Sequence, residues 1–212
     1  MVDAMKVVNE GAEAKIYREK LLDANAIAKT RERKRYRNEK LDLYLREHRT
    51  KNEAKIMLYL EGKGIPLPKL LLVGKYTIFM DYIKGIRLSN MLKEMENRPN
   101  QENVEKYMEE TGRYLGIMHN CNAIHGDFTP ANLIISLGKV YVIDFGLSFI
   151  SNSIEDKAID LLLMKRALSK KLYLLFIDGY KKTENESGII IEKLKEIEMR
   201  GRYQTRTLSA AN

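Results

Sequence analysis

Short apolar segments alternate with turn residues through the first part of the chain. Such segments are typical of strands, and Gly74-Lys75 between the last two predicts a tight antiparallel connection. A polar, basic run, Thr30–Lys51, interrupts the pattern before a predicted helix, Lys51–Glu61, which ends at Gly62 and Gly64. The predicted strands include Val7 and Val8, Lys15–Tyr17, Ala26–Ala28, Leu70–Val73 and Tyr76–Met80.

After Gly85 the apolar spacing becomes helical. Val104–Met118 carries a stripe with alternating intervals of four and three residues, as on one buried helix face. Further helices are predicted at Asp156–Leu168, Lys171–Gly179 and Ile189–Met199, and a short hairpin at Leu133–Ile135 and Val140–Ile143. The pattern predicts an α+β fold: a small β-rich lobe with one main helix, residues 1–85, and a reduced α-helical lobe, residues 86–212.

Composition adds limits on location and partners. Of 212 residues 44% are hydrophobic, yet no apolar stretch approaches the roughly 20 residues that a membrane-spanning helix needs. No secretory signal is visible, so we expect a cytoplasmic protein without a membrane partner. Cys121 is the only cysteine, which excludes an internal disulfide. A formal charge of +8 favours polyanionic partners such as ATP, RNA or an acidic protein.

Candidate chemistry gathers around the predicted hairpin. His125–Asn132 precedes its first strand, and Asp144-Phe145-Gly146 follows its second. Because antiparallel strands return the chain to its starting edge, Asn132 and Asp144 are expected to lie close together. Magnesium prefers oxygen donors and takes one or two carboxylates from a protein, so this pair is a candidate magnesium site.

Asp127 lies on the loop leading to the same edge, where its carboxylate would orient an attacking hydroxyl or water and accept its proton. A lone Asp or Asn is more often a turn residue or a helix cap. The joint occurrence of H-G-D, an Asn five residues later, a short hairpin and D-F-G favours the catalytic interpretation.

This arrangement resembles protein kinases, whose catalytic loop ends in Asp and Asn with the same spacing before a hairpin and D-F-G. The resemblance implies that Lys29 binds ATP phosphates and that Glu53 pairs with Lys29. Without that resemblance Glu53 reads as an ordinary solvated helix residue. The implied nucleotide-binding residues are Gly11, Ala12, Glu13 and Ala14 in place of the glycine-rich loop, Lys29, and the hinge residues Met80, Asp81 and Ile83.

The chain departs from ordinary protein kinases in two places. Gly126 stands where many kinases carry an Arg that grips a phosphorylated activation loop. Gly146 is followed within about ten residues by the next helix, with its structural Asp160, so a long activation segment is missing. Conventional activation by loop phosphorylation is therefore not expected.

The kinase motifs, taken together with these two departures, make the chain similar to the small atypical serine/threonine kinase subunit of the KEOPS complex. That complex installs threonylcarbamoyl-adenosine in transfer RNA. The resemblance implies a magnesium cofactor and either ATP hydrolysis or autophosphorylation. It also implies two protein partners, a threonylcarbamoyl-transferase subunit and a small regulatory subunit. In some members the transferase is fused ahead of the kinase on one polypeptide. Its motifs here are Glu10-Gly11-Ala12-Glu13-Ala14, Lys29, Lys34-Arg35-Tyr36-Arg37, Leu41-Asp42, His125–Asn132, Asp144-Phe145-Gly146, Glu155-Asp156-Lys157-Ala158 and Arg200-Gly201-Arg202.

Two basic segments are candidate contacts for transfer RNA phosphates. A solvated charged loop and terminus is an equally ordinary interpretation. The candidate residues are Lys34, Arg35 and Arg37 in the first segment and Arg200, Arg202 and Arg206 in the second.

Two alternative functions stay open at this point. A small-molecule kinase of the aminoglycoside or choline type also uses H-G-D and a downstream Asn, but about 66 residues after Gly146 leave little chain to enclose an acceptor. A catalytically silent RNA-binding scaffold would keep only the shape. The full set of Lys29, Asp127, Asn132 and Asp144 argues against a complete loss of catalysis.

Overall fold

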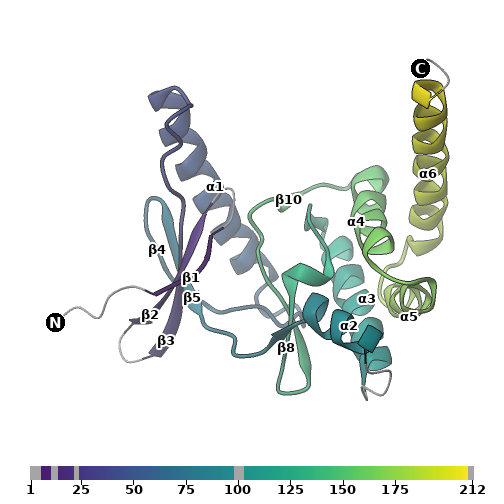
Figure 1. Ribbon diagram of the computed structural model, residues 1–212, viewed down its shortest axis with the longest axis horizontal. Coiled ribbons are helices and arrows are strands. Elements are labelled where there is room, and N and C mark those ends of the chain that lie inside the picture. The colour runs from purple at the N-terminus through teal and green to yellow at the C-terminus, as the bar shows by residue number, and fades with distance from the viewer. Residues whose placement is uncertain (1–5, 11–13, 22–23, 98–102, 210–212) are drawn as a thin grey trace. The chain divides into compact units, whose positions relative to one another are not determined.

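The protein is seen in a computed structural model that describes residues 6–10, 14–21, 24–97 and 103–209 (Figure 1). The chain folds into two compact units. The first consists of Met1–Asn90 with Asn132–Ser148, and the second of Met91–Ala131 with Phe149–Asn212. No helix in the described parts of the chain has the length and apolar character needed to cross a membrane.

The first unit contains a five-stranded antiparallel sheet. Helix α1 contacts β4 and β5, and its buried Met57 and Leu60 belong to the same core as Ile78 on β5. The predicted strands are confirmed with small shifts in their ends. In sheet order the strands are β1 (Lys6–Glu10), β2 (Lys15–Leu21), β3 (Ala24–Thr30), β5 (Thr77–Asp81) and β4 (Leu70–Val73).

Helix α1, Glu39–Leu60, begins well before the predicted start at Lys51, so the expectation for the preceding run was wrong. The Asn38 side chain caps the helix by accepting from the backbone N–H groups of residues 40 and 41. Ion pairs four residues apart, Asp42 with Arg46 and Glu47 with Lys51, support the early turns. These turns therefore form without the hydrophobic stripe on which the prediction relied.

A second, three-stranded sheet lies in the first unit. It contains β6 (Ile86–Arg87), β8 (Leu133–Ser136) and β9 (Lys139–Val142), in the order β6-β8-β9. Leu137 and Gly138 turn the hairpin with positive φ angles of 49° and 74°. Because β8 pairs with β6, the hairpin groups with the N-terminal residues, whereas the sequence analysis expected one boundary after residue 85.

Helix α2, Leu88–Asn97, was not predicted. Leu88, Met91, Leu92 and Met95 follow helical spacing, so the signal was present in the sequence.

The second unit is mainly helical. Its helices α3 (Val104–Asn120), α4 (Ile154–Ala167) and α5 (Lys170–Lys181) are close to the predicted ones, while α6, Ser187–Ser209, extends further at its end. The short strands β7 (Ala123–Ile124) and β10 (Phe149–Ile150) pair antiparallel. Helices α3 and α5 pack at close range, since a Cβ on Gly179 would lie 2.0 Å from the carbonyl oxygen of Glu109.

Candidate active site

Lys29 and Glu53 form a buried ion pair between the sheet and helix α1. Lys29 lies near the end of β3, and Glu53 lies in the second half of α1. The Lys29 Nζ atom is 2.7 Å from Glu53 Oε1, and the two side chains are 8% and 1% exposed. Charges this deeply buried need partners, because removing an isolated charge from water is costly. The structure brings the two residues together, and their roles in catalysis stay a prediction.

Asp144 is held beside Lys29 by the hairpin. The Lys29 Nζ atom is 2.6 Å from Asp144 Oδ1. Asp144 has a φ angle of 64°, in the left-handed region that residues other than glycine rarely adopt. The backbone N–H of Gly146 donates to the same carboxylate at 3.2 Å. Such strained residues cluster at functional sites, where the surrounding structure holds them in place.

Asn132 precedes the first strand of the same hairpin, at the open end where the second strand leads to Asp144. The Asn132 carbonyl accepts the backbone N–H of Ile143 at 3.0 Å, and Leu133 pairs with Val142 in the ladder that follows. Antiparallel pairing thus places Asn132 next to the segment that ends in Asp144.

These side chains line one pocket of the first unit, with a volume of about 280 Å³. Its walls combine apolar side chains from both sheets with a few converging polar groups, as in many small-molecule sites. Seven residues expected at the site lie on these walls: Lys29, Glu53, Met80, Asp81, Ile83, Asn132 and Asp144.

The pKa of Lys29 reflects two opposing effects. Burial lowers the pKa, because desolvation disfavours the charged ammonium. The carboxylates of Glu53 and Asp144 outweigh burial and raise the pKa above its ordinary value. Lys29 therefore carries a full positive charge at neutral pH, as a phosphate-binding residue requires.

The donor set of the pocket fits magnesium. The carboxylate of Asp144 and the amide oxygen of Asn132 are hard ligands on one wall, and the Asp144 side chain is 46% exposed. Within the described ranges no three His, Cys, Asp or Glu side chains are grouped as a metal cluster. A magnesium ion held by Asp144 and Asn132 would complete its shell with water and phosphate oxygens, as magnesium commonly does.

The predicted phosphate loop lies only partly in the described chain. Gly11, Ala12 and Glu13 fall outside the described residues. Ala14 is described and half-buried just before β2, and Glu10 pairs with Lys15 where β1 and β2 meet. Residues 11–14 thus stand between β1 and β2 in the sequence, and a phosphate-binding role for them stays a prediction.

Asp127 lies in the second unit, on a loop that a buried carboxylate organises. The Asp160 side chain accepts the backbone N–H of His125 at 2.7 Å and that of Gly126 at 2.9 Å. Gly126 has a φ angle of 78°, which favours glycine. At the position where many kinases carry an Arg, this chain has a glycine, which suits the positive φ angle there.

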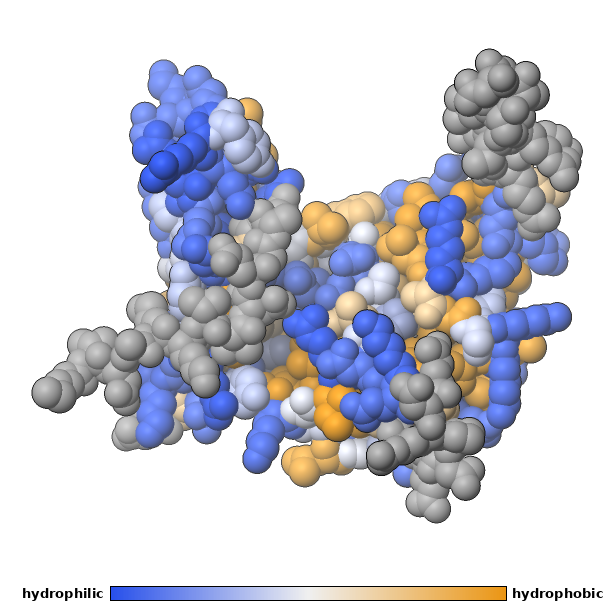
Figure 2. Space-filling model, viewed as in Figure 1, coloured by the Kyte–Doolittle hydropathy of each residue, from blue (hydrophilic) through white to orange (hydrophobic). Residues whose placement is uncertain are grey.

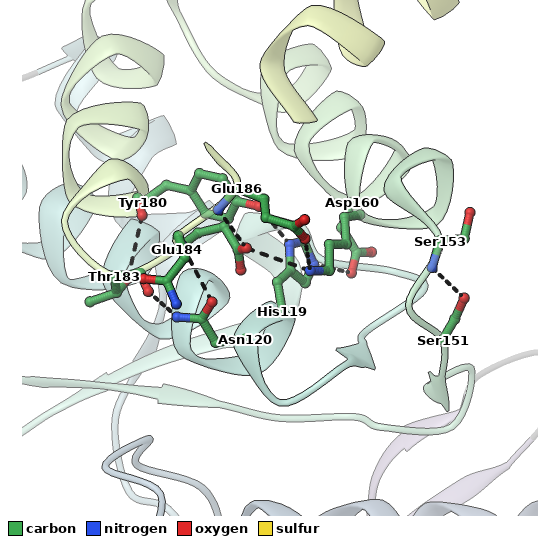
Figure 3. Close-up of polar contacts among 11 residues, drawn as sticks. His119, Asn120, Ser151, Ser153, Asp160, Tyr180, Thr183, Glu184 and Glu186 are labelled. Atoms are coloured by element: carbon green, nitrogen blue, oxygen red, sulfur yellow. Dashed lines mark hydrogen bonds and ion pairs between the residues drawn. The ribbon is translucent and has the colours of Figure 1, made fainter. Parts of the chain in front are cut away.

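His119, Asp160 and Tyr180 form a buried network behind this loop (Figure 3). His119 Nδ1 is 2.9 Å from the Tyr180 hydroxyl, and His119 Nε2 is 3.3 Å from Asp160 Oδ2. All three side chains are completely buried. Burial, assisted by the nearby Glu184 and Asp160 carboxylates, raises the pKa of Tyr180, so its hydroxyl stays protonated.

The first basic segment precedes α1. Lys34 donates its backbone N–H to Asp42 at 3.0 Å, and the Arg37 guanidinium lies over the Tyr36 ring at 5.4 Å. Arg35 lines a second pocket of the first unit, of about 880 Å³. The other residues of this basic pocket are Thr30, Arg31, Glu32, Arg33, Arg46, Lys75, Tyr76 and Thr77.

The second basic segment forms the last part of helix α6. Arg200 is exposed and lies 3.6 Å from Glu155 and 3.6 Å from Glu196. The side chains of Arg202 and Arg206 lie outside the described residues.

Arg31 was considered only as part of a basic run, Arg31–Arg37, and was not predicted to lie beside Lys29 and Glu53. Its guanidinium Nη2 is 2.6 Å from Glu53 Oε2, and its side chain is 4% exposed. The available signal was its position two residues after Lys29, which in an extended chain points both side chains to the same side.

Comparison with known proteins identifies the family of the chain. The family model described as RIO domain matches residues 3–165. The KEOPS complex subunit Bud32 of Pyrococcus abyssi is 38% identical over 220 residues, covering 96% of this chain and 98% of that protein. A probable serine/threonine-protein kinase BUD32 homolog of Archaeoglobus fulgidus is 38% identical over 202 residues, covering 92% and 95%.

A longer relative and a solved structure extend the comparison. A probable bifunctional tRNA threonylcarbamoyladenosine biosynthesis protein of Methanocaldococcus jannaschii is 34% identical over 206 residues, covering 93% of this chain and 37% of that protein. The structure of a Rio2 kinase–ADP/Mg²⁺–phosphoaspartate complex from Chaetomium thermophilum aligns with a TM-score of 0.61 at 15% identity, covering 94% of this chain and 70% of that one. That likeness shows a mixed α+β, kinase-like fold. The chain belongs to the RIO-domain family of atypical kinases and, within it, to the family of the KEOPS complex subunit Bud32.

Proposed function

We propose that this chain is a magnesium-ATP-dependent atypical serine/threonine kinase and ATPase that acts as a subunit of a cytoplasmic KEOPS complex. One observation carries the proposal: a buried lysine is bound by two carboxylates, Glu53 at 2.7 Å and Asp144 at 2.6 Å, in a pocket that Asn132 also lines. Kinases combine these residue types to hold the phosphates and magnesium of ATP.

In this proposal each residue has a separate task. Lys29 binds the α- and β-phosphates of ATP, and the side-chain oxygens of Asp144 and Asn132 hold magnesium, which neutralises charge on the phosphates. Residues 80–83 form an apolar wall and backbone edge for adenine. Asp127 orients the acceptor hydroxyl or water and accepts its proton.

The proposed RNA partner is a transfer RNA that receives threonylcarbamoyl-adenosine from a transferase subunit. Support comes from the relatives, whose names include a KEOPS subunit and a tRNA threonylcarbamoyladenosine biosynthesis protein. The basic pocket supports it further, because Arg33, Arg35, Arg46 and Lys75 line it and Glu32 is its one acidic residue. The Arg46 guanidinium also lies 4.0 Å from the Tyr76 ring centroid. This contact holds the guanidinium in place, so that the pocket offers a preorganised charge to phosphates.

The surface around this pocket is polar. Figure 2 shows hydrophilic surface over the N-terminal part of α1, which Figure 1 labels. Tyr44 on α1 and Tyr36 just before the helix are exposed at 63% and 79% and offer faces for base stacking.

ATP turnover tests the enzymatic part. The full chain is assayed with magnesium and ATP alone, with the transferase subunit, with transfer RNA, and with both. We expect turnover that the combined additions stimulate and that Asp144→Ala abolishes. Turnover at the background level, equal in the parent chain and in Asp144→Ala, would instead support a silent scaffold.

Transfer RNA binding tests the partner. We expect the double variant Arg33→Gln, Arg35→Gln to weaken binding about equally for different RNA sequences and to reduce its salt dependence, because phosphate contacts release counterions. Asp178→Asn on α5 changes an exposed charge elsewhere and serves as the control. Unchanged affinity and salt slope in the double variant would remove the basic pocket from the proposal.

A further inference from the structure

Arg31 is buried and pairs with Glu53, the same carboxylate that pairs with Lys29. Its Nη2 atom is 2.6 Å from Glu53 Oε2, and its Nη1 atom is 3.4 Å from Thr50 Oγ1. Thr50 is completely buried, and the Arg31 and Glu53 side chains are 4% and 1% exposed. A guanidinium in such a place is held by specific partners and does not act as a surface charge.

The local structure explains why these groups meet. Arg31 follows the last residue of β3, and its backbone N–H donates to the carbonyl of Tyr76 at 2.9 Å, which continues the strand pairing. Lys29 and Arg31 are two positions apart, and both side chains reach Glu53. Thr50 and Glu53 are three positions apart on α1 and share one helix face. Two cations on the sheet side thereby face one carboxylate on the helix side.

The two cations bind different oxygens of Glu53. Lys29 binds Oε1 at 2.7 Å, and Arg31 binds Oε2 at 2.6 Å. Rotation of the carboxylate would break at least one of these contacts, and a buried charge left unpaired is costly. Arg31 therefore fixes the plane of Glu53, and Glu53 in turn fixes the ammonium of Lys29.

Charge balance gives Arg31 a second effect. Lys29 contacts two carboxylates, Glu53 and Asp144, so on its own it would leave this group with a net negative charge. Arg31 brings the group to two cations and two carboxylates. Its guanidinium is close to the pocket residues, since a Cβ on Gly146 would lie 3.4 Å from Arg31 Nη2 and 3.4 Å from Lys29 Nζ. The charges of Lys29, Arg31 and Glu53 act strongly on one another because burial limits screening by water.

We propose that Arg31 is a positioning residue for phosphate binding: it orients and neutralises Glu53, so that the ammonium of Lys29 remains available to the phosphates of ATP. The inference rests on the proposed function. Without Arg31, Lys29 would be the one cation facing the carboxylates of Glu53 and Asp144. The site would then carry a net negative charge and repel the triphosphate.

Steady-state ATP turnover of the full chain with magnesium tests this role. We expect Arg31→Gln to raise KM for ATP about tenfold while kcat changes less than about threefold, because binding is weakened equally in the ground and transition states. Arg31→Lys keeps the charge and is expected to restore KM to within about threefold of the parent. The control Arg166→Gln, an exposed residue on α4, should leave both constants unchanged.

A double-mutant cycle makes the test specific. If Arg31 acts through Glu53, then Arg31→Gln should not raise KM further in a Glu53→Gln chain. The Glu53→Gln, Arg31→Gln pair carries no uncompensated charge, so it remains informative if Arg31→Gln alone does not fold. A parent-like KM in Arg31→Gln, or an equal increase in both backgrounds, would overturn the inference. So would a loss of kcat and Tm with unchanged KM, since that is the result of a merely structural role.

Lys29→Met in the same series separates this inference from the proposed function. If Lys29→Met turns over ATP as fast as the parent, the proposed function fails and the role of Arg31 fails with it. If Lys29→Met loses turnover while Arg31→Gln keeps the parental KM, the inference about Arg31 alone is overturned.

Discussion

Lys29 and Asp144 are 115 positions apart in the chain, yet Lys29 Nζ lies 2.6 Å from Asp144 Oδ1. One residue comes from the central strand of the five-stranded sheet, and the other from the end of the β8–β9 hairpin. The contact joins the residue that the kinase resemblance implied for phosphate binding to one of the two residues predicted from the hairpin to bind magnesium.

Replacing the pocket lysine should remove most of the activity. We expect Lys29→Met to lower ATP turnover at least about a hundredfold, because a preorganised charge aimed at phosphate is lost. ADP release measured with magnesium and saturating ATP checks this, and Lys55→Met, an exposed lysine on α1, is the control. Comparable losses in the two variants would contradict a special role for Lys29.

Acid should weaken the start of helix α1. The backbone N–H of Lys34 and the guanidinium of Arg46 hold the pKa of Asp42 below its ordinary value of 3.8. A carboxyl with a lowered folded-state pKa stabilises the fold above its unfolded pKa, and this contribution disappears as pH falls through the folded value.

We therefore expect the free energy of unfolding of the parent to fall more steeply than that of Asp42→Asn as pH decreases from about 5 to about 2. Urea unfolding at several pH values measures both slopes. Asp178→Asn, an exposed change on α5, should keep the parental slope. Identical slopes for the parent and Asp42→Asn would show that Asp42 adds nothing to acid sensitivity.

The second unit contains a buried lysine that should be costly to remove. Lys157 Nζ is 3.5 Å from Glu184 Oε1, and the side chains are 3% and 1% exposed. We expect Lys157→Met to lower the free energy of unfolding by about 3 kcal/mol, because Glu184 is left as an uncompensated buried charge. Adding Glu184→Gln should recover much of the loss in urea unfolding, and an equally unstable double variant would contradict this.

The α3–α5 contact should tolerate no side chain at Gly179. A Cβ there would lie 2.0 Å from the backbone oxygen of Glu109, so we expect Gly179→Ala to cost about 1–3 kcal/mol. Gly188 on α6 has no atom within 4 Å of an added Cβ, and Gly188→Ala should be neutral or slightly stabilising. Thermal unfolding of both variants compares them, and equal Tm values would contradict the close packing.

Much of the fold was readable from periodicity. The stripe in Val104–Met118 predicted α3, and the turn residues between two apolar runs predicted the β8–β9 hairpin. The early turns of α1 were missed, because an N-cap and ion pairs, not a hydrophobic stripe, support them there. Local interactions of that kind leave only a weak signal in an apolar pattern.

The sequence by itself determined which side chains the site contains. It also determined that Asn132 and Asp144 lie near each other, because they flank the two strands of one hairpin. Strand pairing makes such local proximity unavoidable. The kinase resemblance implied the pair of Lys29 and Glu53, but only the tertiary structure decided that the pair is buried and that Arg31 joins it. The physical reason is that burial and long-range pairing depend on how separate elements pack, and a charged residue in a sequence carries no mark of whether water or a partner will surround it.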